Sequence, residues 1–188
     1  MTVARVTARA LVLGLVSGVL LTVTHRLLPD QWAVLAGTSA LWGVVSLFAG
    51  RRLGGRTVHG AAAGLTAMVG VLIPWLAIHA VSTPPAELAL WMIVGPVAGA
   101  ICGAAGAMSR MPGRRGALAA GVVPGIVGGE AVYGLLLIGG PAWGLESVLA
   151  AGLLVAVSRR GGRLRALGSA AVLVALAAAA CVVYDSIP

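Results

Sequence analysis

The sequence predicts an all-α fold, a polytopic membrane bundle of about seven transmembrane helices that forms a single domain over residues 1–188. Hydrophobic residues make up 60% of the chain and charged residues only 10%, whereas a water-soluble domain carries about 25% charged residues. The apolar residues gather in stretches long enough to cross a bilayer. Nearly all arginines lie between those stretches, as in membrane proteins with short cytoplasmic loops.

Each crossing takes about 20 mostly apolar residues. Seven stretches meet or approach that length, at residues 8–26, 32–50, 60–82, 87–108, 117–139, 142–158 and 166–185. Arg5 and Arg9 precede the first stretch and no small-residue cleavage site follows it, so we expect a retained helix rather than a signal peptide. Asp30 directly precedes the second stretch and is expected to be its N-cap.

The later stretches carry prolines and acids at informative positions. Pro74, Pro96 and Pro124 lie inside the third, fourth and fifth stretches, where each removes a backbone hydrogen bond and is expected to kink its helix. Glu87 lies in the first turn of the fourth stretch, where the helix dipole favours an acid. The sixth stretch is short, so six spans with a re-entrant segment is the alternative topology. The seventh ends at Asp185.

The arginines predict the orientation of the bundle. The chain has 13 arginines and no lysine, and they precede the first span or follow the second, fourth and sixth, except for Arg26. With a cytoplasmic N-terminus, twelve of the 13 are cytoplasmic and the C-terminus is outside. We therefore expect a multi-pass protein of the inner (cytoplasmic) membrane, surrounded by membrane lipid. Because the arginines follow the loops, the net charge of +8 does not predict a nucleic-acid partner.

Glycines recur at a spacing of four on several spans. Small residues at this spacing let helix backbones approach closely. The pattern predicts a tightly packed bundle, and the same faces offer a surface for a homo-oligomer. The residues are Gly14 and Gly18; Gly60 and Gly64; Gly95, Gly99 and Gly103; Gly121, Gly125 and Gly129.

Glu130 is the strongest candidate for chemistry, because it is an acid inside an apolar span. It lies about 13 residues, hence about 20 Å, from the cytoplasmic end of the fifth span. An ionised carboxylate at this depth is costly, so we expect Glu130 to be protonated, paired or in contact with a water-filled cavity. The alternative is a neutral acid that hydrogen-bonds to a neighbouring helix and only stabilises the bundle.

The tryptophans predict an aromatic pocket on the outer side. An interfacial belt explains Trp32 and Trp143, but a belt normally occupies both interfaces and the inner one has no Trp. We therefore expect an outward-facing pocket for a lipophilic small molecule. The expected lining is Trp42, Trp75, Trp91, Tyr133, His79 and Glu146.

Sequence motifs for several classes of chemistry are absent from the chain. There is no P-loop, no dinucleotide fingerprint, no zinc-ligand spacing and no nucleophile elbow, so no cofactor and no metal are expected. Cys102 and Cys181 lie in apolar stretches near opposite faces of the predicted bilayer, and we expect no disulfide between them.

Two resemblances extend this interpretation. Three features of the sequence carry the first: the Leu-Leu-Pro-Asp-Gln-Trp start of the second span (residues 27–32), the Arg51-Arg52 turn and the Ala/Gly-rich spans. In these features the chain resembles a family of small integral membrane proteins of unknown function from high-GC bacteria. In size, span number and buried acids it is also similar to integral membrane terpene cyclases of meroterpenoid and indole-terpenoid pathways. That resemblance implies proton-initiated cyclisation of a polyprenyl chain or its epoxide, with Asp30 and Asp185 as acids near the second and last spans.

Three functions remain open from the residues themselves. In a cyclase, Glu130 protonates the substrate with Asp185 or Asp30 as its partner, and indole rings stabilise the carbocations. In a transporter or channel for a small solute or cation, Glu130 carries a proton or binds the cation. An accessory membrane subunit needs only the glycine faces.

Overall fold

The computed structural model describes residues 3–79 and 83–185, and over these ranges its regular elements are all helices. Among the described residues, six segments are long and apolar enough to cross a membrane, and α8, with 17 residues, is shorter. A π-helical turn, Gly134–Ile138, follows α7, and a 3₁₀ turn, Arg160–Gly162, precedes α9. The helices are α1 Val3–Leu27, α2 Asp30–Gly37, α3 Ser39–Leu53, α4 Thr57–His79, α5 Pro85–Met108, α6 Gly113–Ala120, α7 Val122–Tyr133, α8 Pro141–Val157 and α9 Arg163–Asp185.

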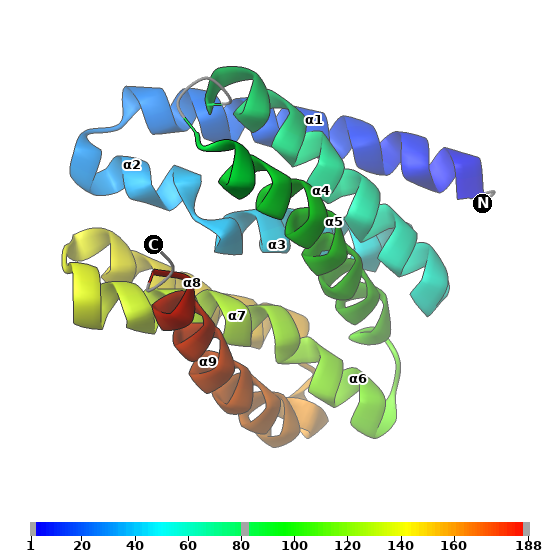
Figure 1. Ribbon diagram of the computed structural model, residues 1–188. Helices are drawn as coiled ribbons and strands as arrows, with labels where there is room; N and C mark the ends of the chain where they lie inside the picture. Colours follow the sequence, from blue (N-terminus) through cyan, green and yellow to red (C-terminus); the bar gives the residue numbers. More distant parts are fainter. Residues whose placement is uncertain (1–2, 80–82, 186–188) are drawn as a thin grey trace.

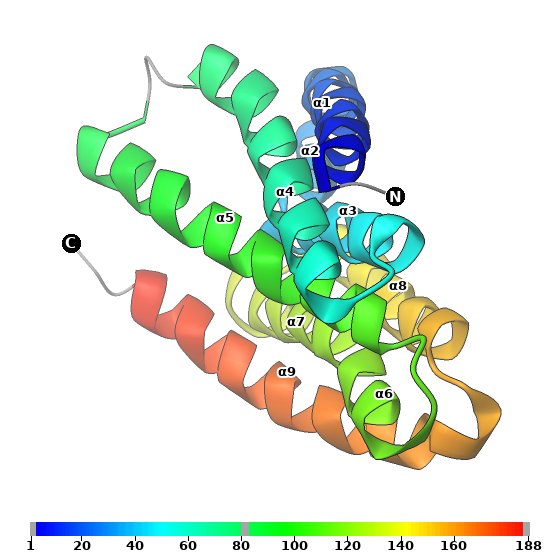
Figure 2. The same ribbon diagram turned by 90° about the vertical axis from the view of Figure 1, so that its right-hand side faces the viewer.

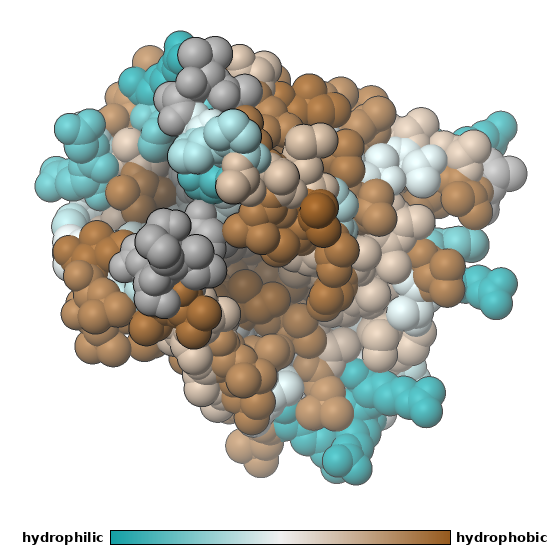
Figure 3. Space-filling model, in the orientation of Figure 1, coloured by the Kyte–Doolittle hydropathy of each residue, from teal (hydrophilic) through white to brown (hydrophobic). Residues whose placement is uncertain are grey.

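The prediction of an all-helical protein with several membrane-spanning helices is confirmed. Large apolar side chains cover the outside of the helices; Leu20 is 61% exposed, Ile93 68% and Leu136 77%. Figure 3 shows hydrophilic side chains gathered at opposite ends of the molecule, with apolar surface between them. Such a surface needs lipid rather than water around it.

Helices α1, α3, α4 and α5 form the closely packed N-terminal half, in which α4 lies between α1 and α5. The glycine spacing explains this closeness. A Cβ atom on Gly103 of α5 would lie 2.6 Å from the Cα atom of Gly64 on α4, so only glycine fits at this crossing. The glycines of α1 and α7 likewise pack against α4 and α9. These faces are occupied by helices of the same chain, so a homo-oligomer would need a different surface.

The C-terminal half consists of α6 to α9, with α7 packed between α8 and α9. The fifth apolar stretch is interrupted at Gly121, between α6 and α7. Pro124 explains this interruption, because it has no N–H to donate to the carbonyl of Ala120 one turn earlier. Pro74 and Pro96, by contrast, lie within the uninterrupted helices α4 and α5.

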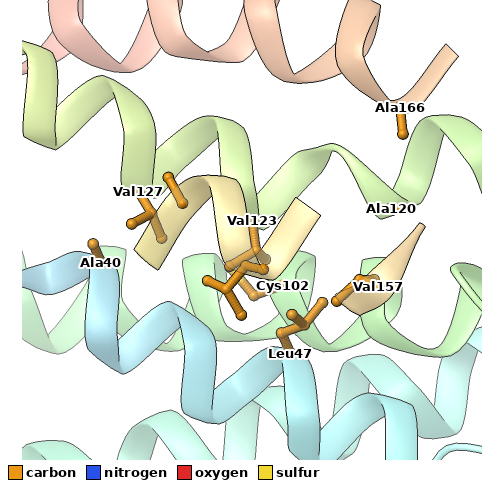
Figure 4. Packing of buried hydrophobic residues seen from close by; sticks show 10 residues of the cluster. Ala40, Leu47, Cys102, Ala120, Val123, Val127, Val157 and Ala166 are labelled. Atoms are coloured by element: carbon orange, nitrogen blue, oxygen red, sulfur yellow. The ribbon is translucent and has the colours of Figure 1, made fainter. Parts of the chain in front are cut away.

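A core of small apolar side chains joins the two halves (Figure 4). It includes Ala40 and Leu47 of α3, Cys102 of α5 and Val123 and Val127 of α7, all at most 2% exposed. The start of α1 and the connections α3–α4, α5–α6 and α8–α9 lie at one end of the bundle (Figures 1 and 2). The arginine clusters of the sequence therefore come together at that end.

Candidate functional site

The second apolar stretch is a broken helix, because α2 ends at Gly37 and α3 begins at Ser39 (Figure 1). Thr38 lies between them with an extended backbone, φ −66° and ψ 137°. Its Oγ1 atom donates a hydrogen bond to the Leu35 carbonyl at 3.1 Å, which satisfies one carbonyl at the end of α2. The first turn of α3 then carries backbone N–H groups without acceptors in their own helix, at the positive end of the helix dipole.

Glu130 of α7 supplies an acceptor for that first turn. Its Oε2 atom accepts a hydrogen bond from the backbone N–H of Ala40 at 2.9 Å. The carboxyl group is half-buried and caps α3 from a helix 90 residues further along the chain. The contact joins the two halves of the molecule. It fits the alternative interpretation of the sequence, in which this acid hydrogen-bonds to a neighbouring helix and stabilises the bundle.

Glu146 of α8 is a second buried acid, and its environment differs from that of Glu130. It is 1% exposed, and neither carboxyl oxygen has a hydrogen-bond partner among the residues that the structure describes. Glu130 lies on α7, which packs against α8, and its charge acts on Glu146. A buried carboxyl without partners is much less costly as the neutral acid than as the anion. The two acids therefore form a pair in which only Glu130 has a hydrogen bond to a neighbouring helix that accounts for its position.

A groove with a volume of about 600 Å³ is lined in part by Glu146. Its walls are the α2–α3 break and one side of α8, and Thr38 and Glu146 are the polar residues among mainly leucine side chains. Leu145 and Val148 on its rim are 52% and 67% exposed, as expected for side chains in contact with lipid. The volume is in the range of small-molecule sites, about 300–1,000 Å³. The groove is therefore large enough for an apolar molecule, which would lie beside Glu146 while both carboxyl oxygens are buried.

The structure brings together four of the residues predicted to line a pocket, Trp42, Trp75, Trp91 and His79. The ring centroid of Trp42 lies 5.5 Å from that of Trp75 and 5.7 Å from that of Trp91, and His79 stacks on Trp75 at 5.0 Å. The cavity beside this cluster has a volume of only about 20 Å³, room for about one water molecule. The indole rings pack against one another there and leave no room for a polyprenyl chain.

The remaining predicted site residues lie elsewhere. Asp30 is exposed in the first turn of α2, ten residues before Ala40 and on the other side of the break at Thr38. The prediction that it is an N-cap is wrong, because Pro29 holds that position and no side chain caps the helix. Tyr133 is half-buried at the end of α7. Asp185 is the last residue of α9, and its side chain lies outside the described part of the chain.

Trp143 also departs from the sequence interpretation. A headgroup position was expected, but Trp143 is 5% exposed, and its ring packs against Gly134 so closely that a Cβ there would overlap it. Cys102 and Cys181 are free, as expected. Within the described ranges no three His, Cys, Asp or Glu side chains are placed to hold a metal ion.

The helix break at Thr38 was missed because the residues on both sides of it are apolar. A signal is nevertheless present in the run Gly37-Thr38-Ser39. Glycine favours helix C-termini, and Thr and Ser favour helix N-caps, so this order is typical of one helix that ends and another that begins.

Comparison with known proteins gives a family and no function. No curated protein and no solved structure matches the chain. The sequence model of a family of unknown function, DUF6518, matches residues 1–187. This match agrees with the resemblance to a family of unknown function, and it carries no information on high-GC bacteria or on terpene cyclases. Because the match covers nearly the whole chain, the protein belongs to the DUF6518 family.

Proposed function

We propose that this protein is a proton-coupled transporter of lipophilic cations, in which Glu146 and Glu130 exchange a proton for the cation. The observation that carries the proposal is the unpartnered carboxyl group of Glu146 at the wall of an apolar groove of about 600 Å³. Ionisable groups inside membrane segments commonly mark proton and ion pathways.

The chemistry of the groove favours a cation with an apolar body. No basic residue is among the residues that line it, and its two nearby acids carry up to two negative charges. Two interacting carboxyl groups lose their protons in separate steps, and a bound cation favours the loss of a proton from the pair. The leucine and valine walls accommodate the apolar part of the same ligand. Broken membrane helices such as α2–α3 are a recurrent feature of transporter binding sites.

A proton-release measurement tests this function on the purified protein. Tetraphenylphosphonium, a lipophilic cation, is added to the protein in weakly buffered detergent solution with a pH-indicator dye. We expect proton release, up to about one proton per chain, and no release from Glu146→Gln. Glu87→Gln is the matched control, because Glu87 is an acid in the first turn of α5 and does not line the groove. Wild-type protein that binds the probe without proton release, or that does not bind it, would refute the proposal.

We further propose seven crossings, with the N-terminus in the cytoplasm and the C-terminus outside, in the inner membrane. The gathering of the arginine-bearing connections at one end of the bundle supports this topology. Helix α8 is about 25 Å long, so it crosses a bilayer only where the bilayer thins locally.

Cysteine labelling in a Cys102→Ala, Cys181→Ala background tests the topology. Cysteines at Arg51 and Arg114 should react only after a reagent enters the cytoplasm, and a cysteine at Pro84 should react from outside. Reaction of the Arg51 and Pro84 positions from the same side would contradict the seven-span arrangement.

Acid-catalysed cyclisation of a polyprenyl chain or its epoxide remains the second candidate. The observation in its favour is the same buried carboxyl, because a neutral acid in an apolar site can protonate an alkene or an epoxide. The carbocations would then form in the groove, which none of the indole rings of Trp42, Trp75 and Trp91 lines. Incubation with prenylated aromatics and indoles, with mass-spectrometric detection of cyclised products, distinguishes the two functions.

A further inference from the structure

A second cavity, with a volume of about 250 Å³, lies at the arginine-rich end of the molecule. One wall is the α5–α6 connection with the start of α6, and the other is the α8–α9 connection with the first turn of α9. Figure 2 shows these two connections beside α6. Arg159 and Arg165 line the cavity, and both are exposed.

Positive charge gathers around this cavity, and the two connections that form it carry no acidic residue. Ser109 lines the cavity and its Oγ accepts a hydrogen bond from Arg51 Nη1 at 2.6 Å. The charge of Arg51 is in turn close enough to those of Arg110 and Arg159 for mutual repulsion. The five acids of the sequence are at positions 30, 87, 130, 146 and 185, so neither connection contains one. Such an uncompensated cluster favours an anion.

The backbone around the cavity also suits an anion. Helix α6 begins at Gly113, which lines the cavity, and no side chain caps its first turn. The N–H groups of a helix N-terminus point toward negative charge and bind phosphate. Gly161 and Gly162 line the facing wall, so side chains do not keep a ligand away from the backbone there.

We propose that this cavity binds the phosphate group of an anionic membrane lipid. Arginine recognises phosphate through paired N–H donors, and two arginines face this space. Leu164, beside Arg165, is 85% exposed, and Leu118 on α6 is 39% exposed, so apolar surface for an acyl chain lies next to the cavity. Arg159 is 13 residues, hence about 20 Å, along the chain from Glu146, so this site is separate from the groove.

Titration of lipid into the purified full-length protein in detergent, followed by native mass spectrometry, tests the proposal. Dioleoylphosphatidylglycerol should bind with a stoichiometry of about one and more tightly than dioleoylphosphatidylcholine. Arg159→Gln combined with Arg165→Gln should weaken its binding about 30-fold, because each arginine near a lipid surface contributes about fivefold. Arg114→Gln combined with Arg115→Gln is the matched control, because it removes the same charge from exposed positions of α6 that do not line the cavity.

Three results would overturn the proposal. Equal weakening in both double variants would mean that only the general surface charge attracts the lipid. Equal binding of the two lipids by the wild-type protein would exclude an anion-selective site, and this comparison needs no variant to fold. Displacement of bound phosphatidylglycerol by millimolar inorganic phosphate would assign the cavity to free phosphate instead of a lipid.

Discussion

Replacement of Glu146 by methionine should make the protein more stable. Glu146 is 1% exposed and both carboxyl oxygens are without a hydrogen-bond partner in the described part of the chain. A polar group in that condition costs about 1–3 kcal/mol, because it has lost water and gained nothing. Methionine has a similar length, is unbranched and adapts to irregular spaces, so it removes the polar atoms without leaving a large cavity.

The expected gain in the free energy of unfolding is therefore about 1–3 kcal/mol, or about 5- to 150-fold in the unfolding equilibrium. For a soluble domain of this length, each kcal/mol shifts the melting temperature by about 2–4 °C, so a shift of several degrees is expected. Glu146→Gln should change the stability much less, because its amide remains buried without partners. Both variants should lose the proton release induced by tetraphenylphosphonium.

Thermal unfolding of the purified variants in one detergent, followed by circular dichroism at a single pH, measures this effect. If Glu146 only stabilised the bundle, its removal would lower the melting temperature. A Glu146→Met protein that is less stable than the wild type would therefore refute the inference that this carboxyl group destabilises the bundle.

Three further predictions concern the surroundings of the site and use the same unfolding measurement. Glu130→Ala removes the acceptor for the Ala40 N–H and should lower the free energy of unfolding by about 1–2 kcal/mol. Glu130→Gln retains a carbonyl oxygen there and should lower it less. Equal losses in the two variants would contradict the capping role. Gly103→Ala should cost about 1–3 kcal/mol or more because its Cβ meets the α4 backbone. Gly168→Ala in α9 is the control, because its Cβ meets open space, and it should be neutral or stabilise the helix by up to about 1 kcal/mol. Trp42→Leu should destabilise the protein by about 1–3 kcal/mol, because packing in the aromatic cluster is lost, and it should leave proton release intact. Unchanged stability with lost proton release would instead make Trp42 part of the binding site.

The helical framework could be predicted from the sequence because membrane crossings leave a simple signal, a run of apolar residues that ends in charge. The expected span at residues 60–82 and the observed helix Thr57–His79 agree over residues 60–79 for this reason, and residues 80–82 lie outside the described part of the chain. The break at Thr38 could not be found in the same way, since hydropathy averages over a window longer than the break. The run Gly37-Thr38-Ser39 is the local sign, and such small residues are common inside unbroken membrane helices too.

The site was predictable only in part. Glu130 stood out because a charged residue interrupts an apolar span. Its partner on the first turn of α3 depends on tertiary contacts across 90 residues, and so does the position of Glu146 against α2 and α3. The placement of Trp42, Trp75 and Trp91 on one side of the bundle indicated that their rings would come near one another. It gave no information on whether the rings would surround a cavity or fill it, because that depends on the crossing distances of α3, α4 and α5.

Glu130 and Glu146 differ in whether the structure of the bundle explains their presence. A helix that begins inside a membrane must find acceptors for its first N–H groups, and Glu130 provides one, so the bundle gives a sufficient structural reason for this residue. Glu146 has no such reason, because it caps nothing and neither oxygen accepts or donates a hydrogen bond within the described part of the chain. A bundle held only by glycine contacts and small apolar side chains would be more stable without it. A buried polar group that lowers the stability of the protein is typical of a functional site, because activity often requires residues that are unfavourable for stability. In the proposed exchange Glu146 is therefore the first carrier of the proton, and Glu130 caps α3 and adds a second negative charge on the neighbouring helix.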